Sequence, residues 1–284
     1  MAATAVVFAY HDVGVRCLSV LLEEGVSVPL VVTHKDDPDE KIWFASVPDF
    51  AVSRKIDVAL DPSVETLRQK LQSTRPDFIF SFYYRRMLRP ELLALAKRGA
   101  YNMHGSLLPK YRGRAPVNWA VLKGETETGA TLHEMTAKPD AGAIVGQARV
   151  PIGPDDLAVE VFGKVTEAAV VVLRSSLKDL ISGKIKPRPQ DLSKGSYFGA
   201  RRPEDGRIDW SRPAQEIHNL VRAVAPPFPG AFAEFQGKTL RVLKTKLEEK
   251  RTARAQGPFQ EGDQWWAVGG DGKVLRLLEV EFPA

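Results

Sequence analysis

The sequence has a single cysteine, Cys17, among its 284 residues, so no disulfide bond can form within the chain. It also lacks any apolar run of the roughly 18 residues that a membrane-spanning helix needs. Residues 1–10 have neither the basic start nor the small-residue cleavage site of an export signal, and they have the pattern of a buried strand instead. These absences predict a cytoplasmic protein with no membrane span.

Charge is nearly balanced, with 40 basic and 35 acidic residues and a net charge of +5. Because no dense tract of lysine and arginine is present, we expect no nucleic-acid partner, whereas an anionic small molecule such as a nucleotide suits the mild cationic bias. Hydrophobic residues make up 44% of the chain and charged residues 26%, which is typical of a globular protein. The length allows one large domain or two smaller ones.

Short apolar runs alternate with helical patterns over the first hundred residues. Because strands separated by helices form parallel sheets that helices cover on both faces, this part predicts a doubly wound fold. Strands are expected at residues 6–10, 28–33, 56–60, 78–82 and 100–103, and helical patterns follow Val15, Val64 and Pro90, the last over residues 90–97.

The pattern changes further along the chain. Two alternating segments, 128–136 and 143–150, precede a long amphipathic helix over residues 161–180. After a proline-rich stretch and a helix at 213–224, strands follow one another without helices, at residues 231–235, 239–247, 265–268 and 274–282. The predicted fold class is therefore α/β, with a doubly wound, mostly parallel, Rossmann-like sheet and a small, partly open C-terminal β-barrel that is OB-like. The predicted limits are 1–190 for a catalytic domain, 191–204 for a linker and 205–284 for the barrel.

Polar residues suited to acyl transfer gather between residues 99 and 142. Asn102 and His104 lie two apart on an extended segment, so they share a face at the carboxyl end of a predicted parallel strand. Asp140 lies in a tight turn. An amide stabilises an oxyanion, a histidine moves a proton, and a carboxylate fixes the tautomer of that histidine. Taken singly, each residue also suits a structural role, the asparagine and the aspartate as turn formers.

The wider motif resembles that of the 10-formyltetrahydrofolate-dependent formyltransferases, Asn-x-His-x-Ser-Leu-Leu-Pro followed by an Asp-x-Gly turn. The matching residues are Asn102, His104, Ser106, Leu107, Leu108, Pro109, Asp140 and Gly142. The resemblance covers the whole chain, and it implies that Asn102, His104 and Asp140 are catalytic.

Segments outside the motif look like the formyltransferase domain of the bifunctional UDP-4-amino-4-deoxy-L-arabinose enzyme, which serves lipid A modification and polymyxin resistance. These segments are residues 8–14, which lack the Gly-Thr-Pro loop of the tRNA enzymes, and residues 80–85, 110–119 and 198–205. No Gly-x-Gly-x-x-Gly follows a strand, so no nicotinamide site is expected. Because the sequence given ends at Ala284, without room for a decarboxylase domain, we expect either a stand-alone formyltransferase or one domain of a larger enzyme.

The resemblance implies an N-formyltransferase with 10-formyltetrahydrofolate as co-substrate, a nucleotide-linked amino sugar as acceptor and no metal. The implied folate contacts are Arg86, Met87, Leu88, Arg114, Thr136, Ala137, Lys138, Pro139 and Asp140. The implied acceptor contacts are Tyr10 and Arg201. The remaining histidines, His133 among them, lack metal-binding spacing.

Two alternatives stay open at this point. Methionyl-tRNA formyltransferase shares the chemistry but needs a continuous basic surface. A catalytically silent protein that binds a nucleotide sugar or a folate is the alternative from another class. The identity of the sugar and of the nucleotide, the oligomeric state and the existence of a separate decarboxylase partner also stay open.

Overall fold

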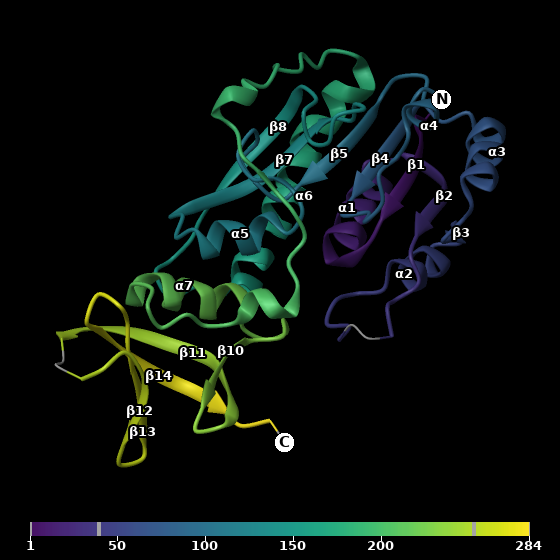
Figure 1. The fold of residues 1–284 in the computed structure, drawn as a ribbon. Helices are drawn as coiled ribbons and strands as arrows, with labels where there is room; N and C mark the ends of the chain where they lie inside the picture. Colours follow the sequence, from purple (N-terminus) through teal and green to yellow (C-terminus); the bar gives the residue numbers. More distant parts are fainter. Residues whose placement is uncertain (1, 39–40, 252–253, 284) are drawn as a thin grey trace. The chain divides into compact units, whose positions relative to one another are not determined.

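The computed structural model describes residues 2–38, 41–251 and 254–283. The chain divides into two compact units that interleave along the sequence (Figure 1). The first unit comprises Met1–Gly113, Gly129–Val150 and Lys164–Tyr197. The second unit comprises Arg114–Thr128, Pro151–Gly163 and Phe198–Ala284. The domain limits expected from the sequence stay a prediction.

A seven-stranded sheet forms the centre of the first unit, in the order β3-β2-β1-β4-β5-β7-β8. Strands β1 to β5 pair in parallel, and β7 pairs with β5 in the antiparallel sense. The strands are β1 (Thr4–Ala9), β2 (Ser27–Thr33), β3 (Asp57–Leu60), β4 (Phe78–Phe82), β5 (Ala100–His104), β7 (Glu127–Glu134) and β8 (Ile144–Pro151). The predicted class, α/β with a mostly parallel sheet, is confirmed.

Helices connect these strands and cover the sheet (Figure 1). They are α1 (His11–Glu23), α2 (Val47–Ser53), α3 (Val64–Thr74), α4 (Pro90–Leu93) and α6 (Ala158–Ser182). The predicted helix over residues 90–97 is too long. Helix α4 ends at Leu93, because the N–H groups of Leu95 and Ala96 bond only three residues back, and those of Lys97 and Arg98 bond to the carbonyls of Pro76 and Asp77.

The apolar strands explain why the sheet forms. All five residues of β4, Phe-Ile-Phe-Ser-Phe, are buried, as expected for a parallel strand with helices on both faces. Buried side chains of β1, β2 and β4 form one cluster with Leu67 and Leu71 of α3 and Leu92 of α4. Full burial of one such side chain stabilises the fold by about 1.5–3 kcal/mol.

The strand order places a topological switch at β1. Its neighbours are β2 on one side and β4 on the other. From β1 the chain passes through α1 to β2 on one side, and after β3 it returns through α3 to β4 on the other side. In open α/β sheets, ligands bind at the carboxyl ends of the strands beside such a switch. Tyr10 directly follows β1 at this edge, and β5 ends at His104.

The second unit contains a five-stranded antiparallel sheet in the order β10-β11-β14-β13-β12. Its strands are β10 (Ala231–Phe235), β11 (Lys238–Arg251), β12 (Gly257–Glu261), β13 (Gln264–Val268) and β14 (Lys273–Glu281). Strand β12 was not predicted. The unit also holds α5 (Pro116–Leu122) and α7 (Ala214–Val224), and α7 packs on β11, where His218 Nδ1 lies 2.8 Å from Thr245 Oγ1.

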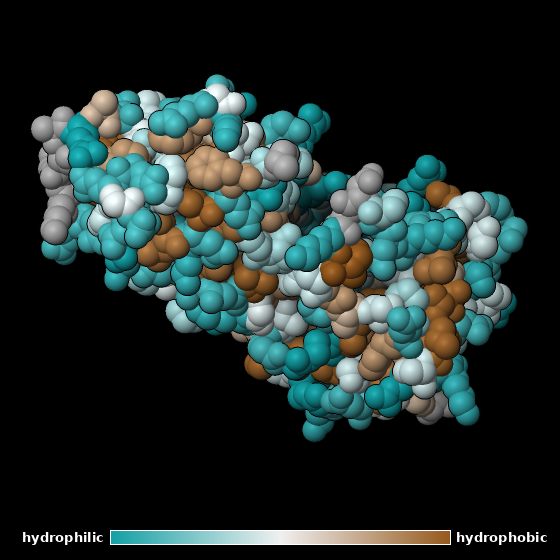
Figure 2. Space-filling model, turned by 90° about the horizontal axis from the view of Figure 1, so that it is seen from below, coloured by the Kyte–Doolittle hydropathy of each residue, from teal (hydrophilic) through white to brown (hydrophobic). Residues whose placement is uncertain are grey.

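Four short elements lie in the stretches between these helices and strands. They are β6 (Arg112–Gly113), β9 (Tyr197–Phe198) and the 3-10 helices η1 (Leu192–Lys194) and η2 (Pro203–Gly206). Within the described ranges, no helix combines the length and the apolar character needed to cross a membrane. On the face that Figure 2 shows, hydrophobic residues form small groups among hydrophilic ones.

His11 makes the stability of the first unit sensitive to acid. Its ring stacks on Phe44 with the centroids 3.9 Å apart, and its Nδ1 accepts a hydrogen bond of 2.8 Å from the N–H of Asp12. Burial, with a further contribution from the charge of Arg85, lowers the pKa of His11 from 6.5 to about 3. The unfolded chain therefore takes up this proton at a higher pH than the folded chain does.

We expect the free energy of unfolding to fall as the pH drops below the unfolded value near 6.5, because only the unfolded state gains the proton. The loss from this one group amounts to at most ~1.4 kcal/mol per pH unit. His11→Asn removes the titration and suits the positive φ of 67° at this position. Urea unfolding of both proteins between pH 7 and pH 4 should give a shallower pH dependence for the variant. Equal slopes would contradict this assignment.

Candidate functional site

Asp140 lies in a turn between β7 and β8 that other parts of the first unit hold in place. Its φ of 49° is in the left-handed region. The side-chain amide of Gln190 donates to the carbonyls of Asp140 and Gly142, at 3.0 and 2.6 Å. Gly142 packs so tightly that a Cβ there would lie 2.0 Å from the carbonyl oxygen of Glu134. The turn therefore gives Asp140 one fixed direction.

His104 closes β5 and is 6% exposed. Its Nε2 lies 2.7 Å from the carbonyl oxygen of Tyr111, which can only accept, so Nε2 carries the proton. Ser106 braces the same loop by donating to the carbonyl of Lys110 at 2.7 Å. The Tyr111 carbonyl therefore fixes the tautomer of His104, a role that the sequence had suggested for Asp140, and Nδ1 is left for proton transfer.

The carboxylate of Asp140 faces two imidazoles. One oxygen, Oδ1, lies 3.7 Å from His104 Nδ1 and 3.5 Å from His133 Nε2. The other, Oδ2, accepts the N–H of Gly113 at 2.9 Å. The structure thus brings His104 and Asp140 together, as the sequence predicts, and adds a second histidine.

These partners decide the charge of Asp140. Burial alone raises the pKa of the carboxyl, since it penalises the ionised form. The charge of His104 when its ring is protonated and the N–H of Gly113 outweigh burial and hold the pKa of this carboxyl well below its usual value. The carboxylate is therefore ionised at neutral pH, and a neighbouring imidazolium would be stabilised by it.

Asn102 joins this cluster through His133. The two residues face each other across the antiparallel pair of β5 and β7, and Asn102 Nδ2 lies 3.1 Å from His133 Nε2. Sequence reasoning considered His133 only as a metal ligand and missed this contact. No local sequence signal pointed to this contact, because it depends on the register of β7 against β5.

The three folate contacts expected after β4, residues 86–88, differ in exposure and in their partners. Arg86 forms an ion pair of 2.7 Å with Asp61, Met87 is 62% exposed, and Leu88 is buried in the core cluster. The second expected group, Thr136 to Asp140, forms the turn before β8. There Thr136 Oγ1 donates to the carbonyl of Lys138 at 2.9 Å, and Thr136, Ala137 and Lys138 are exposed while Pro139 is half-buried.

Tyr10 belongs to an aromatic cluster at the ends of β1, β2 and β4. Its hydroxyl donates to Asp36 at 2.8 Å, and the guanidinium of Arg85 lies 4.5 Å above its ring. The ring of His34 stacks on Tyr84 with the centroids 4.2 Å apart. Tyr10 is 3% exposed, so any ligand contact from it uses a small part of the ring edge or the hydroxyl.

Arg201 and Arg114 both belong to the second unit. The guanidinium of Arg201 lies 4.9 Å above the ring of Trp119, and Phe198 stacks on the same indole at 4.7 Å. Arg201 Nη2 donates to the carbonyl of Asp205 at 3.0 Å. Arg114 is exposed, and its backbone N–H bonds to Phe198. The Trp119 ring and the Asp205 carbonyl thus hold the Arg201 side chain in place. The bond to Asp205 uses one of the five N–H donors of the guanidinium.

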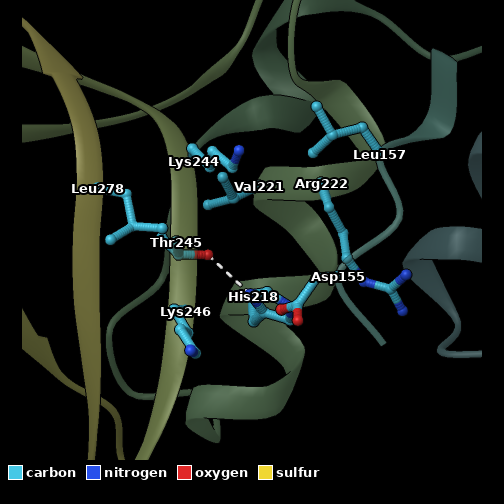
Figure 3. Close-up of a pocket in the computed structure, with 9 residues that line it drawn as sticks. All are labelled: Asp155, Leu157, His218, Val221, Arg222, Lys244, Thr245, Lys246 and Leu278. Carbon is cyan, nitrogen blue, oxygen red and sulfur yellow. Dashed lines mark hydrogen bonds and ion pairs between the residues drawn. The ribbon is translucent and has the colours of Figure 1, made fainter. Parts of the chain in front are cut away.

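A cavity of about 170 Å³ also lies within the second unit, between α7, β11 and the segment before α6 (Figure 3). His218 lines it and is fully partnered, by Thr245 and by the carbonyl of Pro154 at 3.0 Å. None of the predicted site residues lines this cavity. Among the residues that the structure describes, no group of three or more His, Cys, Asp or Glu side chains could hold a metal ion.

Comparison with known families identifies the class. The formyl transferase model matches residues 8–177, and the model of the formyl transferase C-terminal domain matches residues 201–284. The chain therefore belongs to the formyl transferase family, whose members are enzymes, and the enzyme class expected from the motif is confirmed.

Solved structures share the fold over nearly the whole chain. One is an N-formyltransferase from Helicobacter canadensis in complex with folinic acid and dTDP-3-aminofucose, with 21% identity, a TM-score of 0.77 and coverage of 98% of this chain and 99% of that one. Another is WlaRD, a sugar 3N-formyltransferase solved with dTDP and 5-N-formyl-THF, with 19% identity, a TM-score of 0.76 and 98% coverage of both chains. HypX from Aquifex aeolicus with tetrahydrofolic acid has 20% identity and a TM-score of 0.68, over 96% of this chain and 43% of that one.

The tight contact at Gly142 yields a test of the site geometry. Gly142→Ala places a methyl group against the Glu134 carbonyl, so the turn must shift and carry Asp140 with it. We expect kcat to fall at least about tenfold and the free energy of unfolding to fall by about 1–3 kcal/mol, the usual range for overpacking.

Gly163→Ala in α6 is the matched control, because a Cβ there meets nothing within 4 Å. This control should leave kcat unchanged and add up to about 1 kcal/mol of stability. Steady-state kinetics and urea unfolding measure both variants. Equal kinetic behaviour of the two variants would contradict the view that this turn sets the position of Asp140.

Proposed function

We propose that this chain transfers a formyl group from 10-formyltetrahydrofolate to the amine of a nucleotide-linked amino sugar. The observation that carries the proposal is the buried arrangement of His104 and Asp140, with the Nδ1 of the histidine facing the carboxylate. Membership of the formyl transferase family supports the reaction class. The folinic acid and the dTDP-sugar in a structural relative support the classes of donor and acceptor.

The chemistry follows from which atoms can donate and accept. The neutral amine of the acceptor attacks the formyl carbon, and the carbonyl oxygen becomes an oxyanion that an amide N–H of Asn102 stabilises. The amine proton passes to His104 Nδ1, because Nε2 is held by the Tyr111 carbonyl. Asp140 stabilises the resulting imidazolium, which returns the proton to the departing folate nitrogen as the C–N bond breaks.

For the particular acceptor we propose UDP-4-amino-4-deoxy-L-arabinose, which would place the enzyme in lipid A modification and polymyxin resistance. Support comes from the resemblance at residues 80–85, 110–119 and 198–205. Tyr10 and Arg201 are the residues proposed to contact this acceptor. The two sugar N-formyltransferases with dTDP ligands make a dTDP-amino sugar the main competing acceptor.

For the donor we propose contacts from residues 86–88, from the turn of residues 136–140 and from Arg114. Leu88 lies in the core, so its contribution comes from the backbone, whereas the exposed side chain of Met87 is able to touch the folate directly. The turn of residues 136–140 offers backbone groups beside Asp140. Arg114 would supply a guanidinium for an anionic group of the folate.

The direct test uses purified protein, 10-formyltetrahydrofolate and one acceptor at a time. The acceptors are UDP-4-amino-4-deoxy-L-arabinose, dTDP-3-aminofucose and methionyl initiator tRNA, and mass spectrometry follows the product. We expect formylation of the UDP-sugar. Formylation of the tRNA alone would replace the proposal with the tRNA enzyme, and binding without transfer would indicate a silent binding protein.

Substitutions at the two central residues test the roles assigned to them. His104→Ala and Asp140→Asn should each lower kcat by about 10²–10⁴-fold, since each removes a group that moves or balances a proton. The dissociation constant for folinic acid, measured by calorimetry, should change little. Turnover near the native rate in either variant would remove that residue from the mechanism.

Arg201→Ala tests the acceptor contact. The KM for the UDP-sugar should rise roughly tenfold or more, because a hydrogen bond to a charged group is worth about 1.5–3 kcal/mol. The KM for the folate should stay nearly the same. Arg202→Ala removes the same charge from an exposed neighbour and serves as the control. A rise in the folate KM instead would assign Arg201 to the donor site.

A further inference from the structure

His133 is a buried histidine at the site that the mechanism above does not use. It is 2% exposed and lies on β7 opposite Asn102 of β5. Its Nδ1 lies 2.7 Å from the carbonyl oxygen of Glu134. A carbonyl only accepts, so Nδ1 carries the proton and, in the neutral ring, Nε2 presents a lone pair. The backbone therefore fixes the tautomer of His133, as the Tyr111 carbonyl fixes that of His104.

The lone pair on Nε2 decides how the amide of Asn102 is turned. Asn102 Nδ2 lies 3.1 Å from Nε2 and donates one N–H to it. The flipped amide would bring its oxygen against the lone pair, which is repulsive. The second N–H of the amide then remains for another acceptor. His133 thus selects, from the two orientations of the asparagine, the one that presents a donor.

The second neighbour of Nε2 does not compete in the neutral state. Asp140 Oδ1 lies 3.5 Å away, farther than the amide nitrogen, and it attracts Nε2 only when the ring is protonated. The carboxylate has a better donor in the Gly113 N–H at 2.9 Å. In the neutral ring, the hydrogen bond from Asn102 is therefore the interaction that Nε2 of His133 makes.

We infer that His133 is a positioning residue, which holds the amide of Asn102 with an N–H directed at the oxyanion of the transition state. The inference rests on the proposed function as far as the reaction is concerned. The orientation of the amide rests on the geometry of Asn102, His133 and Asp140. A donor that is already oriented costs nothing to align when charge develops on the formyl oxygen. Loss of His133 should therefore reduce kcat and leave substrate binding nearly intact.

A matched pair of variants separates hydrogen bonding from packing. His133→Gln keeps an acceptor oxygen that reaches the position of Nε2, and His133→Met has a similar length and volume but offers no comparable acceptor. We expect His133→Met to lower kcat about 10–10³-fold, up to the effect of losing one oxyanion donor. His133→Gln should recover most of that loss. Both variants should keep each KM within about threefold of native, and equal losses of kcat in the two would overturn the inference.

A double-mutant cycle tests whether His133 acts through Asn102. In an Asn102→Ala background, His133→Met should change kcat less than about twofold, because the amide it orients is already gone. Multiplicative losses would show an independent role for His133 and overturn the inference. Urea unfolding of each variant reports the purely structural contribution separately.

A readout that needs no turnover separates this inference from the proposed function. In ¹⁵N-labelled native protein, nuclear magnetic resonance should detect a scalar coupling through the hydrogen bond between Asn102 Nδ2 and His133 Nε2. The coupling should vanish in His133→Met. If it is present and no acceptor is formylated, the proposed function fails while the orientation of the amide stands. Its absence from the native protein would overturn the inference whatever the activity.

Discussion

The largely buried carboxylate of Asp140 is the group on which the rest of the site depends. It lies where the end of β5, the strand β7 and the loop before α5 meet, near His104 and His133, and it accepts the N–H of Gly113. An ionised carboxylate in a buried position is costly unless charges and donors surround it. The surrounding groups more than offset this cost, so the pKa of the carboxyl lies well below its usual value. The site is therefore arranged around one permanent negative charge.

The fold supplies that arrangement from backbone groups more than from side chains. Carbonyl oxygens of Tyr111 and Glu134 set the tautomers of the two histidines, and a glycine at position 142 lets the turn close against β7. Such groups move little, since strands and a braced turn hold them. Residues whose geometry is fixed before the substrate arrives are what acyl transfer requires, because the transition state gains from donors already in place.

The sequence predicted the parallel part of the sheet and the three motif residues, since both follow from local patterns. Apolar runs such as β4 and the spacing of Asn102 and His104 can be read without knowing the fold. The contact between Asn102 and His133 could not be predicted, because it depends on the register of β7 on β5, which joins residues 31 positions apart. Strand β12 was missed because its sequence, Gly-Pro-Phe-Gln-Glu, begins with two residues typical of turns. The stack of Arg201 on Trp119 also joins distant segments.

We expect formyl transfer to take place at Asn102, His104 and Asp140. A crystal structure of the protein with folinic acid, a stable formyl-folate, and UDP-4-amino-4-deoxy-L-arabinose would show whether the two substrates meet there. The formyl oxygen should lie within about 3 Å of Asn102 Nδ2, and the acceptor amine within hydrogen-bonding reach of His104 Nδ1. A formyl group bound away from these three residues, with the amine directed elsewhere, would show that transfer takes place at another site.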